Sequence, residues 1–96
     1  MKRGTTESGF AFEFDELVLD DMRFVDALAE IVDPDVSDVL TLSATTKLTT
    51  MLLGKEQKKR LYDHIGAKHG GRVPVAELSA EVFEIIRANG KDAEKN

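Results

Sequence analysis

The chain has 96 residues, of which 42% are hydrophobic and 32% charged, with two prolines and no cysteine. Its length fits one domain and is too short for two independent hydrophobic cores. The lack of cysteine excludes disulfide bonds and thiolate metal sites. No apolar run approaches the roughly 18 residues that span a bilayer, and no signal-peptide core follows Met1, so we expect a cytoplasmic protein without a membrane segment.

The net charge of -5 is unevenly distributed along the chain. Residues 1–40 carry eleven acids and three bases, residues 41–72 carry seven bases and two acids, and residues 73–96 carry three bases and five acids. Complementary potentials steer the encounter of two proteins and fix their register. The pattern therefore predicts either two separately solvated faces or head-to-tail association of identical copies.

The first predicted element is a short strand. Residues 1–9 are polar and include two glycines, so we expect a flexible arm. Phe10, Phe12 and Phe14 then alternate with other residues, which is the period that places side chains on one face of a strand. A strand this short needs a partner. The candidates are its own continuation at 17–19 and the extended segment 72–74.

A first helix is predicted after Asp20 and Asp21, because aspartate side chains accept hydrogen bonds from the free N–H groups of a helix start. Pro34 ends this helix, since the residue before a proline is disfavoured in the helical conformation. Between these limits one apolar stripe has helical spacing and is expected to face the core. The residues of the stripe are Met22, Val25, Leu28, Ala29 and Val32.

The rest of the chain predicts further helices. The segment 36–42 is ambiguous, with Ser37 able to cap a turn. One helix should run from Ser43 or Ala44 to Leu53, with Gly54 in the left-handed position that follows a helix end. A surface helix over 55–65 and a glycine-rich loop come next. Pro74 starts the last helix and Asn89–Gly90 closes it.

The predicted fold class is therefore mainly α. Four or so short helices form one domain over residues 10–90, with a short N-terminal β-strand or hairpin. Residues 91–96 are expected to be a disordered charged tail.

No residue pattern predicts catalysis, a cofactor or a metal. His64 and His69 are five residues apart with a glycine between them, which is not a zinc-binding spacing. Asp33, Asp35 and Asp38 resemble the start of a calcium loop, but the glycine and the glutamate that such a loop requires are missing. We expect these aspartates to cap helices and turns, and we expect no enzyme activity.

The basic residues of the surface helix are candidates for binding a partner. Four cations on one and a half turns would neutralise the phosphates of a nucleic acid. However, the net charge is negative, no aromatic residue lies among the cations, and Glu56 weakens the patch. A solvated helix or a protein partner is the favoured interpretation, and a small nucleic-acid-binding regulator is the alternative. The four residues are Lys55, Lys58, Lys59 and Arg60.

Two stretches together resemble the small tail assembly chaperones of long-tailed phages and prophages of Gram-positive bacteria. They are Leu52–Ile65 (LLGKEQKKRLYDHI) and Gly71–Ile86 (GRVPVAELSAEVFEII). The likeness rests on the turn LLG-x-EQ-xxx-L, the approach GRVP and the last amphipathic helix. With the preceding helix it covers about positions 20 to 90, and the first residues depart most from the family.

The resemblance implies a mainly helical, non-catalytic protein that forms homo-oligomers in the host cytoplasm and is absent from the mature virion. Such chaperones coat the tape measure protein and keep it soluble until tail tube subunits assemble around it. Family members are often made in a longer form by ribosomal frameshifting, and the end Glu94-Lys95-Asn96 is compatible with a slippery codon run.

Two modes of self-association are open at this point. In the first, the basic residues 55–60 meet acids from the N-terminal portion of a neighbouring subunit. In the second, the strand containing Phe10, Phe12 and Phe14 pairs edge to edge with the same strand of another copy.

Overall fold

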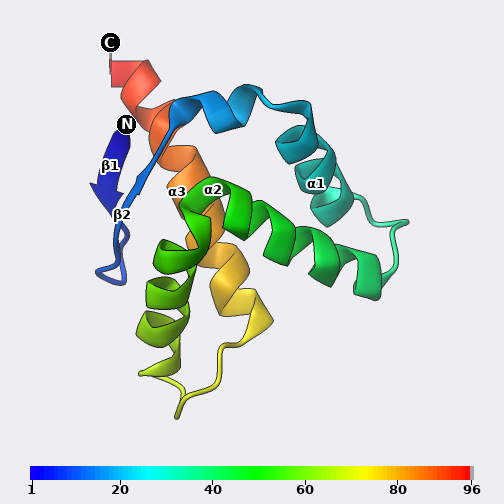
Figure 1. Cartoon of the computed structure of the whole chain (residues 1–96), viewed down its shortest axis with the longest axis vertical. Helices are drawn as coiled ribbons and strands as arrows, with labels where there is room; N and C mark the ends of the chain where they lie inside the picture. Colours follow the sequence, from blue (N-terminus) through cyan, green and yellow to red (C-terminus); the bar gives the residue numbers. More distant parts are fainter. Residues whose placement is uncertain (96) are drawn as a thin grey trace.

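Figure 1 shows a mainly helical chain with a short N-terminal hairpin, which confirms the predicted fold class. The computed structural model describes residues 1–95, and it places the side chains of residues 1–88. Within this part of the chain, no helix has the length and the hydropathy needed to cross a membrane. The elements are β1 (Lys2–Thr5), β2 (Ala11–Phe14), the 3-10 helix η1 (Glu16–Asp20), α1 (Met22–Val32), α2 (Asp38–Gly66) and α3 (Val75–Lys95).

Strand β2 forms where the alternating phenylalanines predicted it, but its partner is β1. The two strands are antiparallel, with Gly4 opposite Phe12 and Arg3 opposite Glu13. The segment expected to be a flexible arm therefore contains a strand. Both candidate partners were wrong, because 17–19 lies in η1 and the described two-stranded sheet contains β1 and β2 alone. The polar residues of β1 have no alternating apolar pattern, so the usual strand signal is missing there.

Helix α1 has the predicted limits but turns a different face to the core. Asp21 caps its start by accepting the Arg23 N–H at 2.9 Å. The buried residues are Phe24 and Ala27, with Leu28 and Ile31 partly buried beside them. Successive residues are about 100° apart around a helix, and burial of the large Phe24 ring turns the predicted stripe toward solvent. Of that stripe, Met22, Val25, Ala29 and Val32 are exposed.

Helix α2 is longer than predicted and is sharply bent (Figure 1). Ser37 caps it, so the ambiguous segment is helical and the helix begins at Asp38. Gly54 has φ 78° and ψ 167° inside the helix, a combination open essentially to glycine alone. It divides α2 into a first limb (38–53) and a second limb (55–66). Gly54 was predicted in the left-handed position that follows a helix end. Its φ is positive as that position requires, but its ψ of 167° lies outside the left-handed helical region.

The hydroxyl groups of the buried threonines in the first limb donate hydrogen bonds to backbone carbonyls of the same helix. Thr45 donates to the Thr41 carbonyl at 2.8 Å, and Thr49 donates to the Thr45 carbonyl at 2.7 Å. Both threonines are buried, and an unpaired hydroxyl there would be costly. These local bonds let polar β-branched residues occupy the core face of the helix.

Helix α3 starts directly after Pro74, as predicted. The Pro74 carbonyl accepts the Leu78 N–H at 3.1 Å, which is the first hydrogen bond of the helix. The helix does not end at Asn89–Gly90 but continues to Lys95. The tail predicted over 91–96 thus falls partly on the last turns of α3, whose side chains lie outside the described part. Asn96 lies outside the described residues altogether.

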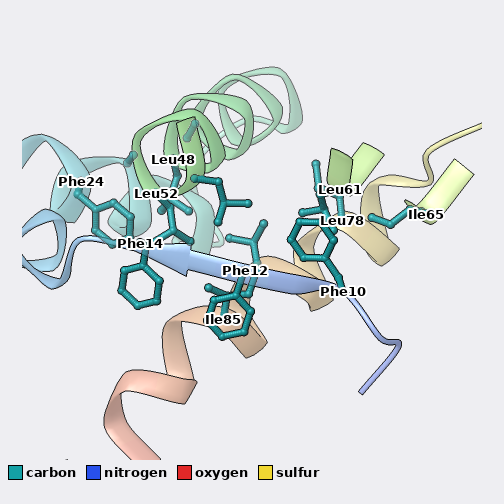
Figure 2. Packing of buried hydrophobic residues seen from close by; sticks show 14 residues of the cluster. Phe10, Phe12, Phe14, Phe24, Leu48, Leu52, Leu61, Ile65, Leu78 and Ile85 are labelled. Atoms are coloured by element: carbon teal, nitrogen blue, oxygen red, sulfur yellow. The ribbon is translucent and has the colours of Figure 1, made fainter. Parts of the chain in front are cut away.

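The core gathers apolar side chains of the helices around those of β2 and the adjacent Phe10. In Figure 2, Phe10 lies toward Leu61 and Leu78, Phe12 toward Ile85, and Phe14 toward Phe24. The Phe12 and Phe14 rings stack with centroids 6.1 Å apart. Phe10 and Phe12 therefore tie the hairpin to α2 and α3, and Phe14 ties it to α1, which explains why such a short sheet is stable here.

Candidate protein-binding surfaces

The three phenylalanines that the sequence placed at an interface lie inside this chain. Phe10, Phe12 and Phe14 are 4%, 6% and 1% exposed. Their side chains are covered by the chain's own helices, so any pairing of this strand with another copy would use its backbone edge.

Gln57 closes the outer edge of β2. The Glu13 N–H donates to Gln57 Oε1 at 2.8 Å, and Gln57 Nε2 donates to the Glu13 carbonyl at 2.7 Å. The same Nε2 donates to the Leu53 carbonyl at 2.8 Å, directly before the bend at Gly54. One amide side chain thus replaces a neighbouring strand and fixes the bend. Edge-to-edge pairing of β2 at this position would have to displace it.

The four predicted cations of the second limb divide between two faces. The guanidinium carbon of Arg60 lies 5.4 Å from the centroid of the Phe10 ring, next to the hairpin. Lys58 crosses the bend to donate to Thr46 Oγ1 at 2.6 Å and Thr50 Oγ1 at 3.0 Å. Among the described residues, Lys55 and Lys59 are exposed and have no such partner. Two of the four cations therefore serve this fold, and two face solvent.

The exposed lysines border a shallow hollow of about 390 Å³ on the second limb. We call it the lysine hollow, and it is lined by Lys55, Lys58, Lys59, Tyr62 and Asp63. Lys58 Nζ lies 5.6 Å from the centroid of the Tyr62 ring. Aliphatic lysine stems and the tyrosine ring give the hollow apolar walls, while the ammonium groups make its rim positive. A larger open groove of about 580 Å³, which shares Lys55 with the lysine hollow, lies between the hairpin and the bend.

A polar cluster holds the turn of the hairpin against α3. Glu81 is 7% exposed, and its Oε1 accepts the Thr6 hydroxyl at 3.1 Å and also the Ser8 hydroxyl. His64 Nε2 lies 3.0 Å from Ser8 Oγ. Because the Ser8 proton is donated to Glu81, the imidazole donates to Ser8 instead of removing its proton. The geometry differs from a Ser-His-acid triad, in which the carboxylate contacts the histidine.

The remaining histidine and aspartate predictions concern metals. In the part of the chain that the structure describes, no three histidine, aspartate or glutamate side chains are gathered as a metal ion requires. Asp33 instead accepts the Asp35 N–H at 2.9 Å, the turn-capping role that the sequence predicted.

The exposed face of α1 is a surface that sequence reasoning missed. Met22, Val25 and Val32 are 66%, 39% and 64% exposed, and Ala29 is exposed between them. Their spacing of three, four and three residues is that of one side of a coiled coil. We call these four residues the α1 seam. The signal was present in the sequence as an apolar stripe, but it was assigned to the core.

A second apolar surface lies at the start of α2. Val39, Leu40 and Leu42 are 74%, 53% and 47% exposed, and we call them the α2 tip. Leu42 also lines a hollow of about 150 Å³, between the first limb and the start of α3. Most of the large apolar side chains that are exposed in the described chain therefore lie within residues 17–42. They belong to the α1 seam, to the α2 tip and, with Leu17, to η1.

The residues that carry the family resemblance have clear structural roles. In the turn LLG-x-EQ-xxx-L, Leu52, Leu53 and Leu61 are buried, Gly54 makes the bend, and Gln57 clamps it. In GRVP, Gly71 has φ 93° and its N–H donates to the Gly66 carbonyl at 2.8 Å. These motifs therefore encode a bent helix and a turn. Comparison with models of protein families, with curated proteins and with solved structures finds no match to the chain.

Proposed function

We propose that the chain is a non-catalytic tail assembly chaperone of a long-tailed phage or prophage. In this proposal it self-associates in the host cytoplasm and binds the tape measure protein, and with it tail tube subunits, during tail assembly. It is not part of the mature virion.

The observation that carries the proposal is the α2 tip, which is part of the apolar surface exposed by residues 17–42. Large apolar side chains gathered on a surface mark sites of protein interaction. The α2 tip is a short apolar helix face beside a small hollow, and such a face accepts the apolar stripe of an amphipathic helix. A tape measure protein is long and helical, so it would offer many such stripes in succession.

The resemblance gives the proposal its second support. The two motifs build the bend and the turn that set α1, α2 and α3 around the hairpin. A protein of this family would need that framework to present its binding faces. The alternative, a nucleic-acid-binding regulator, loses two of its four cations to contacts within the fold, since Lys58 and Arg60 are engaged there.

Co-expression with the tape measure protein encoded downstream of this gene tests the proposal. We expect the chaperone to raise the soluble fraction of the tape measure protein and to co-purify with it. The double variant Leu40→Lys and Leu42→Lys should lose both effects, while Ala76→Lys, at an exposed position on α3, should keep them. A tape measure protein equally soluble with and without the chain would refute the proposal.

A further inference from the structure

We propose that the α1 seam of one copy docks in the lysine hollow of the next copy, which makes the assembly head to tail. This inference rests on the self-association in the proposed function and names its two surfaces. It does not depend on what client is bound, because the residues of the α2 tip belong neither to the seam nor to the lining of the lysine hollow.

The first argument is the exposed seam itself. Its four side chains follow the coiled-coil spacing over the whole length of α1, and the other side of the same helix already packs against the core. An apolar seam on a helix is normally covered by a partner. Among the described residues of this chain nothing covers Met22 and Val32, which are about two-thirds exposed.

The second argument is charge. Residues 15–38, which include α1 and both of its ends, contain nine acids and one base. Asp26 borders the seam and Glu30 lies beside it, and both are exposed. Two α1 seams packed against each other would bring these acids together, and like charges across an interface are unfavourable. These charges favour a basic partner surface over a symmetric seam-to-seam dimer.

The lysine hollow is the matching surface on the same chain. It combines apolar walls with the two exposed lysines, Lys55 and Lys59, that lack a partner among the described residues. Asp63 is its one acidic member, so cations predominate. Figure 1 shows α1 and the second limb of α2 on opposite sides of the bend, well apart. A seam therefore reaches a hollow only in another copy.

Two different surfaces in contact form a heterologous interface, which closes into a ring or continues as a filament. This geometry has a consequence that a symmetric dimer lacks. A copy with a damaged seam keeps a working hollow, and a copy with a damaged hollow keeps a working seam. Neither variant assembles alone, but a mixture of the two again brings an intact seam together with an intact hollow.

The test uses two charge-reversal variants of the full chain. The seam variant carries Asp26→Lys and Glu30→Lys, and the hollow variant carries Lys55→Glu and Lys59→Glu. All four positions are exposed, and Lys58 is left intact because it spans the bend. The control carries Lys47→Glu and Arg72→Glu, which change the net charge as the hollow variant does but at other exposed positions. Mass is measured by light scattering over a range of concentrations, after circular dichroism shows that each variant is folded.

We expect the wild type and the control to assemble, and each reversed variant to need at least roughly tenfold higher concentration, equivalent to about 1.4 kcal/mol. The mixture should assemble again with the two variants in equal numbers, because each surface of one variant is complementary in charge to a surface of the other, and a chain with all four reversals should assemble by itself. A monomeric wild type, a mixture that stays monomeric, or reversed variants that assemble normally would each overturn the inference. The proposed function fails separately, if assembly is intact and the tape measure protein is not bound.

Discussion

The clamp made by Gln57 predicts a large loss of stability from one small substitution on the helix surface. Gln57→Ala removes three hydrogen bonds of 2.7 to 2.8 Å, two to the backbone of Glu13 and one to the Leu53 carbonyl. A hydrogen bond within a protein contributes about 1 kcal/mol net. Since Gln57 and Glu13 are half-buried, water restores part of the loss, and we expect the free energy of unfolding to fall by about 2 kcal/mol.

That loss is a large part of the total for a chain of this size, which is roughly 5–14 kcal/mol. It corresponds to a fall in melting temperature of roughly 8–16 °C. Gln57→Glu should cost a similar amount, because a carboxylate oxygen would then face two carbonyl oxygens. The control is Glu56→Ala, at an exposed neighbouring position, which should stay within about 0.5 kcal/mol of the wild type.

Urea unfolding followed by circular dichroism measures these changes. The slope of the unfolding free energy against urea concentration should stay the same, which shows that the same amount of surface becomes exposed on unfolding. If Gln57→Ala is no less stable than Glu56→Ala, the clamp does not fix the edge of β2 or the bend. The reasoning given for the LLG-x-EQ-xxx-L motif would then be refuted.

Three further predictions follow from the bend, the hairpin and the charges. Gly54→Ala should lower the free energy of unfolding by about 1–3 kcal/mol in the same urea assay, because φ 78° with ψ 167° is strained for any residue with a Cβ. Gly4→Ala should cost about 1–3 kcal/mol, since its Cβ would lie 2.7 Å from Cζ of the buried Phe12 ring, whereas Thr5→Ala on the exposed neighbour should change little. The assembled mass, measured by light scattering, should fall as salt is raised, since the Debye length shrinks from about 10 Å at 0.1 M to about 3 Å at 1 M. A mass that does not change with salt would contradict charge-driven assembly.

The elements with local signals were predictable from the sequence. The alternating phenylalanines predicted β2, Asp21 and Pro34 predicted the limits of α1, and Gly54 predicted the positive φ at the bend. In each case the signal lies in the residues that adopt the structure, because backbone preference and capping act over a few residues.

The features that depend on distant residues were not predictable in this way. Strand β1 is polar and exists because Gly4 lets the Phe12 ring lie against it and because Arg3 pairs with Glu13. The Gln57 clamp joins residues 44 positions apart. No local pattern in the sequence of β1 or of the second limb predicts either contact.

The face of α1 shows the same limit at the candidate site. Two apolar stripes run along this helix, and both have helical spacing. The sequence does not say which stripe is buried, because that choice depends on the Phe24 ring packing with residues of β2 and α2. The exposed seam, and with it the predicted interface, therefore emerges only once the tertiary structure is known.

The most direct test of the central claim is to ask where a tape measure protein touches this chain. A photo-crosslinking amino acid is placed at Leu40 on the α2 tip or, as the control, at Ala76 on α3, and each variant is co-expressed with the tape measure protein. We predict a covalent product with the tape measure protein from position 40 and none from position 76. Crosslinking that is absent at position 40, or equally strong at both positions, would contradict the proposal that this is a tail assembly chaperone binding its client through the α2 tip.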